Sequence, residues 1–179
     1  MENTVETAVE ILEIPNISEI SLLPRDFKFR IKSATARMTQ NKDVMFNLTC
    51  EFLFPEVVKL REGTFKIGGL EAPMMIVGSR KAVVSNKKFL KLFGLEELIT
   101  FNEENMNNEA KMFEGLCFMA FKGSSKEPLQ REVINDKGEV VRETVTDDSG
   151  KPIYTNKFLI WPSDVRYKID SDQFAQQVF

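Results

Sequence analysis

The sequence contains no histidine and only two cysteines, and these scarcities exclude several kinds of site. Without histidine, the common hydrolase triads and histidine-based proton transfer are absent. Two cysteines alone cannot complete a four-ligand structural zinc site. Cys50 and Cys117 lie in apolar, strand-like runs, so we expect buried free thiols rather than a disulfide. The sequence predicts neither a metal site nor a cofactor.

Long apolar runs and nucleotide-binding glycine motifs are missing as well. No stretch approaches the ~18 apolar residues that span a bilayer, and the first ten residues lack the basic and apolar parts of a signal peptide. The chain has no phosphate-loop motif, no GxGxxG and no GxSxG. We therefore expect a non-enzymatic protein of the cytoplasm, the host cytoplasm if the protein is viral, with no membrane partner.

Charge is distributed unevenly along the chain. Residues 1–24 contain five Glu and no Lys or Arg, residues 25–94 contain 14 Lys and Arg against 6 Asp and Glu, and residues 95–179 contain 10 against 16. Such asymmetry is typical of a surface that faces a polyanion while acidic regions lie elsewhere. The alternative is that these blocks mix in space and give a patchwork surface.

The clearest pattern is a strict alternation in residues 27–32. Three apolar side chains, Phe27, Phe29 and Ile31, alternate with three basic ones. Because successive side chains of a strand point to opposite faces, this predicts a strand with one core face and one basic face. Residues 44–54 alternate in the same way after a polar turn, so the two runs predict a hairpin. The 15 Phe are expected to fill the core.

Further elements follow from shorter signals. Ser85 is a candidate N-cap and Gly94 a candidate C-terminal glycine for a short basic helix. We expect strands at 64–69, 73–78, 112–121 and 151–161, a polar loop at 102–109, and a charged hairpin at 129–146 that projects into solvent, with turns at 135–138 and 147–150.

Together these patterns predict a mainly β (β+α) fold. We expect a small antiparallel barrel resembling the oligonucleotide-binding (OB) fold, with a short helix, a projecting β-hairpin and an N-terminal arm. The predicted organisation is an acidic arm at 1–24, the barrel domain at 25–166 and a C-terminal tail at 167–179.

Basic residues interleaved with aromatic ones on strands are the main functional signal. Proteins that hold single-stranded nucleic acid neutralise phosphates with cations and stack bases on flat rings. Phe118, Phe121 and Phe158 are interpreted as core residues, whereas Tyr154 and Trp161 are better stacking candidates. The candidate nucleic-acid-binding residues are Lys28, Arg30, Lys32, Arg37, Lys122, Lys151, Tyr154, Lys157 and Trp161.

The order of elements resembles that of the OB-fold single-stranded-DNA-binding proteins of bacteriophages. The resemblance covers about residues 25–165 and is carried by the helix KFLKLFGLEEL, the FEG step, the DSGKPI turn and the closing run FLIWPSD. It implies a replication and recombination protein that coats single-stranded DNA. The implied ligand face uses Lys28, Arg30, Lys32 and Arg37 from the first strand, with Lys151, Tyr154 and Lys157 from the last. A terminal Phe, here Phe179, is implied to contact replication proteins.

Two hypotheses lead for the function, ahead of a third, an enzyme or a small-ligand binder. The first is a non-catalytic single-stranded-DNA-binding protein. The alternative is a structural subunit of a virion or another assembly, such as a ring, tube or connector, in which arms reach neighbouring copies in a homo-oligomer. For that role the natural contact segments are residues 1–24, 129–146 and 168–179.

Overall fold

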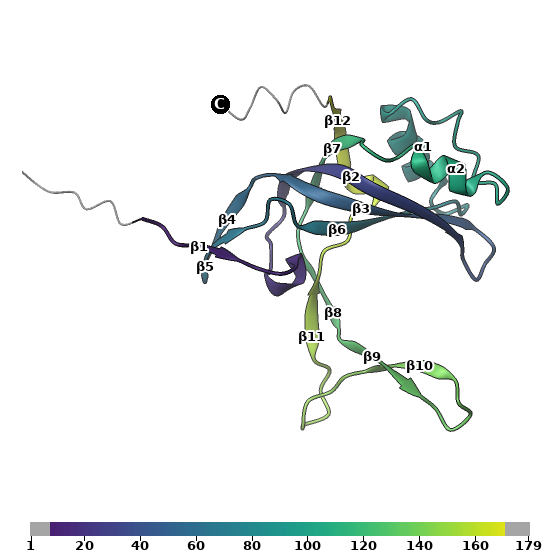
Figure 1. The fold of residues 1–179 in the computed structure, drawn as a ribbon. Coiled ribbons are helices and arrows are strands. Elements are labelled where there is room, and N and C mark those ends of the chain that lie inside the picture. Colours follow the sequence, from purple (N-terminus) through teal and green to yellow (C-terminus); the bar gives the residue numbers. More distant parts are fainter. Residues whose placement is uncertain (1–7, 171–179) are drawn as a thin grey trace, which may run out of the picture.

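The computed structural model describes residues 8–170 of the chain. Strands account for 46% of the described residues and helices for 13%, so the mainly β prediction is confirmed. The body is built on one antiparallel sheet of five strands in the order β12-β7-β2-β3-β6 (Figure 1). Its strands are β2 (Arg25–Met38), β3 (Val44–Phe54), β6 (Glu71–Val77), β7 (Cys117–Lys122) and β12 (Val165–Ile169).

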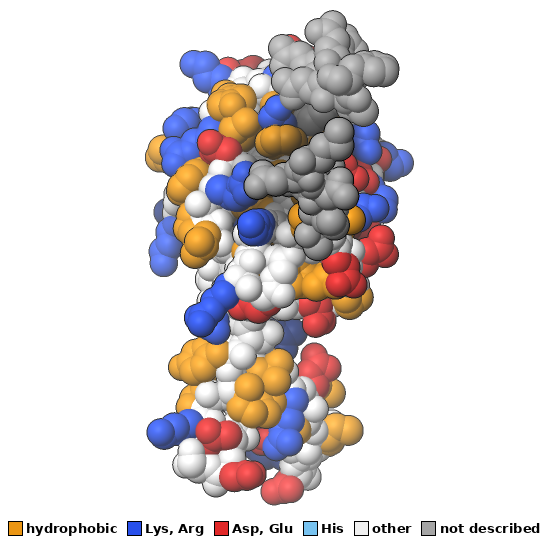
Figure 2. Space-filling model, turned by 90° about the vertical axis from the view of Figure 1, so that its left-hand side faces the viewer, with side chains coloured by type: hydrophobic (Ala, Val, Ile, Leu, Met, Phe, Trp, Pro, Cys, Tyr) orange, Lys and Arg blue, Asp and Glu red, His pale blue; other side chains and the backbone are white. Residues whose placement is uncertain are grey.

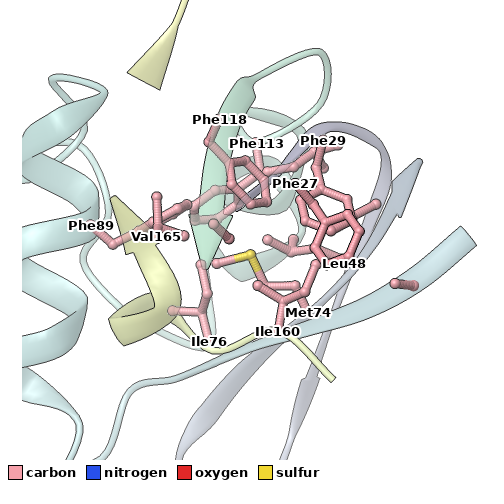
Figure 3. Packing of buried hydrophobic residues seen from close by; sticks show 14 of the residues in the cluster. Phe27, Phe29, Leu48, Met74, Ile76, Phe89, Phe113, Phe118, Ile160 and Val165 are labelled. Carbon is pink, nitrogen blue, oxygen red and sulfur yellow. The ribbon is translucent and has the colours of Figure 1, made fainter. Parts of the chain in front are cut away.

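The alternation in the sequence places one face of this sheet against the core. Phe27, Phe29 and Ile31 on β2 are fully buried, and the pairing Phe29↔Phe52 joins them to β3. Two register shifts interrupt the β2–β3 ladder, one between Lys28 and Phe29 and one between Ile31 and Ser33. The second lets the buried side of β2 continue through Ala34 and Ala36 (Figure 3 shows the buried packing).

Phenylalanine dominates the core, as the composition predicts. Seven of the twelve largest fully buried side chains are Phe. The ring of Phe29 lies 4.7 Å from that of Phe52 and 5.5 Å from that of Phe118, centroid to centroid, with tilted planes. Such offset ring pairs add packing energy to the burial of apolar area. The core therefore depends on aromatic contacts that join β2, β3 and β7.

Two helices in the β6–β7 connection lie at one end of the sheet (Figure 1). Helix α1 (Val83–Leu92) buries Phe89 and Leu90, and Gly94 follows it with a φ of 66°, as expected for a C-terminal glycine. Ser85, however, is not the N-cap, because the helix already begins at Val83 and its N-cap residue is Ala82.

Helix α2 (Met106–Lys111) lies where the sequence indicated a polar loop. The buried carboxylate of Glu109 explains part of the difference. Its Oε1 accepts hydrogen bonds from the Thr100 backbone N–H at 2.9 Å and from the Thr100 hydroxyl at 2.5 Å. Ala110 and Phe113 are also buried here. Tertiary contacts thus stabilise a helix whose own composition is unfavourable.

The N-terminal segment belongs to the body from residue 11 onward. Strand β1 (Ile11–Glu13) pairs in parallel with β5 (Gly63–Lys66), which pairs with β4 (Val57–Leu60). A short 3-10 helix, η1 (Ile17–Glu19), follows β1. Ile17 at its first position, and Ile20 and Leu22 just after it, are part of the hydrophobic core. The packed unit therefore extends past the predicted boundary at residue 24 and is not confined to 25–166.

Residues 125–157 extend away from the five-stranded sheet. We call this segment the arm, which is distinct from the predicted N-terminal arm at 1–24. Strand β8 (Ser125–Pro128) pairs with β11 (Tyr154–Lys157), and beyond it β9 (Gln130–Ile134) pairs with β10 (Val140–Thr144). Figure 1 shows both ribbons extending away from the body, as predicted for this hairpin. The expected turns at 135–138 and 147–150 are present, each closed by a backbone hydrogen bond.

The described strands form open sheets, and no closed barrel is detected among them. An isolated parallel bridge joins Met74 of β6 to Ile160, just before the 3-10 helix η2 (Pro162–Asp164) and β12. The predicted start of the tail at residue 167 falls inside β12, so the body continues to at least Ile169.

Candidate nucleic-acid interface

The basic residues predicted on the first strand lie on the face of the five-stranded sheet opposite the core, which we call the outer face. Lys28 is half-buried, and Arg30, Lys32 and Arg37 are exposed on β2. The shift in the ladder after Ile31 keeps Arg37 on the outer face, because beyond it Ala34 and Ala36 pack against the core and Arg37, next to Ala36, is exposed. The alternation therefore places Lys28, Arg30 and Lys32 on this face, and the register shift adds Arg37 to them.

Two of these cations are paired with carboxylates of neighbouring strands. Arg30 Nη2 lies 2.8 Å from Glu51 Oε2, and Lys32 Nζ lies 2.7 Å from Glu71 Oε1. Glu51 and Glu71 are themselves register partners on β3 and β6, so the four groups form one cluster of alternating charge. The hydrogen bonds that Arg30 and Lys32 donate to these carboxylates raise the pKa of both basic side chains. Part of the predicted positive potential is thereby neutralised within the chain.

Exposed rings and further cations lie beside this cluster on the outer face. Lys28 Nζ lies 5.3 Å from the ring centroid of Phe54, and the register continues across the sheet from Lys28 to Met119 and from Met119 to Tyr167. Tyr167 and Phe121 are 50% and 43% exposed. The guanidinium of Arg166 lies 5.6 Å from the Phe121 ring centroid. Cations and open rings are thus within one or two strand spacings of each other.

Two predicted residues, Lys122 and Trp161, meet at another place. Lys122 Nζ forms an ion pair with Asp164 Oδ2 at 3.1 Å, and the backbone N–H of Trp161 donates to the same oxygen at 2.8 Å. The indole of Trp161 remains partly exposed. Asp164 therefore ties the end of β7 to the turn before β12, and Lys122 has a structural partner there.

The remaining predicted residues lie on the arm. Tyr154 on β11 is exposed and pairs with Pro128 on β8, so it is not beside the β2 cations. Lys157 Nζ forms an ion pair with Glu127 at 2.8 Å, and Lys151 follows the 147–150 turn. The structure thus separates the predicted set into the outer face, the Asp164 junction and the arm. Phe179 lies outside the described residues.

Sequence reasoning missed the outer-face rings. Phe121 ends an apolar run and was interpreted as core together with Phe118 and Phe158, yet of these three only Phe121 is exposed. The predicted boundary puts Arg166 at the last position of the barrel domain and Tyr167 at the start of the tail, whereas both residues lie on strand β12. The available signal was parity, because Phe121 lies two positions from Met119 and three from the buried Phe118.

The described part of the chain offers little to other kinds of chemistry. No group of three or more Cys, Asp or Glu that could hold a metal ion occurs in residues 8–170. Cys50 and Cys117 are buried and free, and burial raises the pKa of both thiols, which disfavours the reactive thiolate. Within the same residues, no helix has the length and apolar character needed to cross a membrane.

Comparison of the sequence with protein-family models and with curated proteins finds no match. The geometry of the outer face and the order of the strands are therefore the features of this chain that bear on its function.

Proposed function

We propose that this protein binds single-stranded DNA, without catalysis, along the outer face of its five-stranded sheet. The observation that carries the proposal is the row Phe54, Lys28, Met119 and Tyr167, flanked by Phe121 and Arg166, on one open sheet face. Exposed rings accept bases of any sequence, and neighbouring cations neutralise phosphates. The corresponding role is phage-type replication or recombination, in the cytoplasm of the host cell.

Strand order supports an OB-like body for this role. In chain order the five strands β2, β3, β6, β7 and β12 occupy the spatial order β6-β3-β2-β7-β12, with both helices between the third and fourth. The bridge Met74↔Ile160 brings the third strand close to the segment that enters the fifth. OB folds are partly open five-stranded Greek-key barrels that bind oligonucleotides on a strand face. We therefore propose an open OB-like barrel with this face as its ligand surface.

Binding to labelled oligo-dT tests the proposal directly. We expect a dissociation constant of about 1 μM or below at low salt, because several cations and rings act together. If about three or four cations contact phosphates, log K should fall with log salt at a slope of about −2 to −3. Fluorescence anisotropy at several salt concentrations measures both quantities. Absence of binding at low salt would contradict the proposal.

The paired carboxylates lead to a second expectation. Replacing Glu71 with Gln leaves Lys32 without its ion-pair partner and removes one negative charge from the outer face. We expect affinity for oligo-dT at low salt to rise about two- to five-fold, and the salt slope to become steeper by about 0.7, since Lys32 becomes available to a phosphate.

A matched control for this substitution is Glu143→Gln on the arm, which removes the partner of Arg131. That variant carries the same charge change away from the outer face. It should leave the affinity within about two-fold, because a remote exposed charge is largely screened by salt. Equal gains from both variants would show that net charge alone governs binding and would argue against a defined outer-face site.

The second candidate function is a structural subunit of an assembly. One observation favours it: the arm exposes apolar side chains, among them Ile134 and Val140. Light scattering without DNA separates the two functions, because a closed ring or filament supports assembly, whereas a monomer or dimer that binds oligo-dT supports the first. Contacts of Phe179 with replication proteins remain part of the first proposal.

A further inference from the structure

Helix α1 and the residues just before it carry a cluster of basic side chains. Residues 79–95 contain five Lys and Arg and no Asp or Glu, and the next acids, Glu96 and Glu97, follow the glycine that ends the helix. All five cations are exposed, and within residues 8–170 none of them forms an ion pair. The three lysines on the helix share one face, opposite the buried Phe89 and Leu90, because residues three and four positions apart lie on the same side. We call the five residues the α1 basic cluster: Arg80, Lys81, Lys87, Lys88 and Lys91.

The charges of this cluster do not stabilise the helix itself. Lys87 and Lys91 lie four residues apart, and Lys88 and Lys91 lie three apart, so like charges are neighbours on one face. Arg80 and Lys81 lie at the positive end of the helix dipole, and the first turn contains no acidic residue. Exposed helices gain stability from opposite charges at these spacings. An arrangement that lacks such pairs fits the binding of an anion.

Several cations of the outer face and of the arm, by contrast, have carboxylates beside them. Arg30 and Lys32 form ion pairs on the outer face, and the arm contains 6 Lys and Arg against 7 Asp and Glu. Figure 2 views the molecule from the side where β1 and β4 lie, and its basic side chains are interspersed with acidic and hydrophobic ones. Helix α1 lies at the other end of the body (Figure 1). Positive charge accumulates there, and such a surface attracts a polyanion.

Helix α1 is held directly against one end of the outer face. Arg37, Met45 and Val77 are register partners across β2, β3 and β6, so Arg37 lies two strand spacings from Val77. The side-chain amide of Asn86, a buried residue of α1, donates a hydrogen bond to the Val77 carbonyl at 2.7 Å. The end of β6 therefore connects the row that begins at Arg37 with the helix.

An open groove of about 490 Å³ separates the β2–β3 turn from the residues that precede α1. The turn contributes Asp43 to its lining, and Arg80 and Lys81 line it from the other side. Asp43 is the only acid among the described residues of this lining, and Lys42 beside it is exposed. Cations therefore outnumber the carboxylate here, and they continue from Arg37 around the end of the sheet to the helix.

We propose that the α1 basic cluster is a second phosphate-binding surface, onto which a single strand of DNA continues after it leaves the outer face near Arg37. This inference rests on the proposed binding of DNA to the outer face. The ten residues of α1 extend about 15 Å, so the helix offers cations along a length of strand rather than at one point.

An anionic membrane fits the α1 basic cluster less well than DNA does. Helices that bind membrane surfaces insert a free apolar face into the lipid. The apolar face of α1 is occupied, because Phe89 and Leu90 are buried and the Phe89 ring lies 5.0 Å from that of Phe93, centroid to centroid. Only the basic side of the helix is open to a partner.

The length of the bound oligonucleotide tests this inference. Oligo-dT of about 5 nucleotides should occupy the outer face alone, whereas oligo-dT of about 20 nucleotides should also reach α1, since one OB fold holds about 4–16 nucleotides. In anisotropy titrations, the α1 variant should bind the longer oligonucleotide about 10- to 100-fold more weakly at low salt, with a salt slope shallower by about 2. It should bind the shorter one within about two-fold of the wild type. The α1 variant combines Lys87→Gln, Lys88→Gln and Lys91→Gln.

Two control variants make the result specific. Replacing the same three α1 lysines with Arg keeps the charge and should leave both affinities within about two-fold. The arm variant removes three exposed lysines that form no ion pair within residues 8–170, and it should also bind both lengths within about two-fold. It combines Lys126→Gln, Lys137→Gln and Lys151→Gln.

The outcomes distinguish this inference from the proposed function. If the α1 variant binds the longer oligonucleotide as the wild type does, or loses affinity equally for both lengths, the second surface is overturned while DNA binding by the chain stands. Equal losses in the α1 and arm variants overturn it as well, because net charge alone would then govern the affinity. A wild-type protein that binds neither length contradicts the proposed function, and the second surface with it. Binding of the wild type, but not of the α1 variant, to vesicles of anionic lipid would assign the cluster to a membrane instead.

Discussion

Replacing Phe29 with Ala is expected to lower the free energy of unfolding by about 3–5 kcal/mol. The side chain is fully buried, and its ring has neighbours on three strands and on the segment before η2, namely Phe27, Phe52, Phe118 and Phe158. Truncation removes both the transfer of the ring from water and the contacts that fill the space around it. Urea denaturation followed by tryptophan fluorescence or circular dichroism measures the loss.

A loss of this size approaches the whole stability of many domains of this length, so a second variant keeps the test informative. Phe29→Leu retains most of the apolar volume and is expected to cost about 1–2 kcal/mol. Phe54→Ala is the matched control, because the same ring is removed from a position that is 53% exposed. That control should change stability by about 1 kcal/mol or less. Equal losses at positions 29 and 54 would contradict the assignment of the core.

The local patterns of this sequence predicted the elements whose causes are local. Alternation over residues 27–32 distinguishes the buried and outer faces of β2, because the two-residue period is a property of any strand. The arm turn at residues 135–138 follows from its Asn, Asp and Gly, and Gly94 adopts the left-handed conformation that ends α1. These features need no knowledge of distant contacts.

Features that depend on contacts between residues far apart in the chain could not be predicted from the sequence. Helix α2 is stabilised by the hydrogen bonds between Glu109 and Thr100. Its six residues contain no apolar stripe that would predict a helix. The ion pairs Arg30–Glu51 and Lys32–Glu71 depend on the register of three strands and on a shift in the ladder after Ile31. Composition counts these cations as available positive charge, whereas the fold places a carboxylate beside each.

The position of Tyr154 shows that the candidate site, too, could be predicted only in part from the sequence. Residues 151–161, which include Tyr154, have the apolar and aromatic side chains expected of the closing strand of a barrel. The part of this run that forms a strand, β11, instead pairs with β8 in the arm, while β12 takes the place beside β7 in the sheet. The tyrosine on the same sheet face as the β2 cations is therefore Tyr167, whose register partner Met119 is in turn the partner of Lys28. Which of two similar strands joins the sheet is decided by pairing and not by composition.

The different positions of Tyr167 and Tyr154 allow a direct test of the proposed DNA interface. Replacing Tyr167 with Ala removes an exposed ring from the outer face, and one stacked base is worth about 1–3 kcal/mol. Affinity for oligo-dT should therefore fall about 5- to 150-fold. Tyr154→Ala on the arm is the matched control, since the two tyrosines are 50% and 56% exposed. The control should bind oligo-dT within about two-fold of the wild type.

The salt dependence of the affinity then distinguishes the contribution of the Tyr167 ring from that of the neighbouring cation, Arg166. Because tyrosine contributes no phosphate contact through charge, Tyr167→Ala should weaken binding at every salt concentration while the slope of log K against log salt stays unchanged. Arg166→Gln, which removes the guanidinium over Phe121, should make that slope shallower by about 0.7. Anisotropy titrations of both variants measure this difference. If Tyr154→Ala weakens binding as much as Tyr167→Ala does, the arm belongs to the DNA site and the outer-face assignment is wrong.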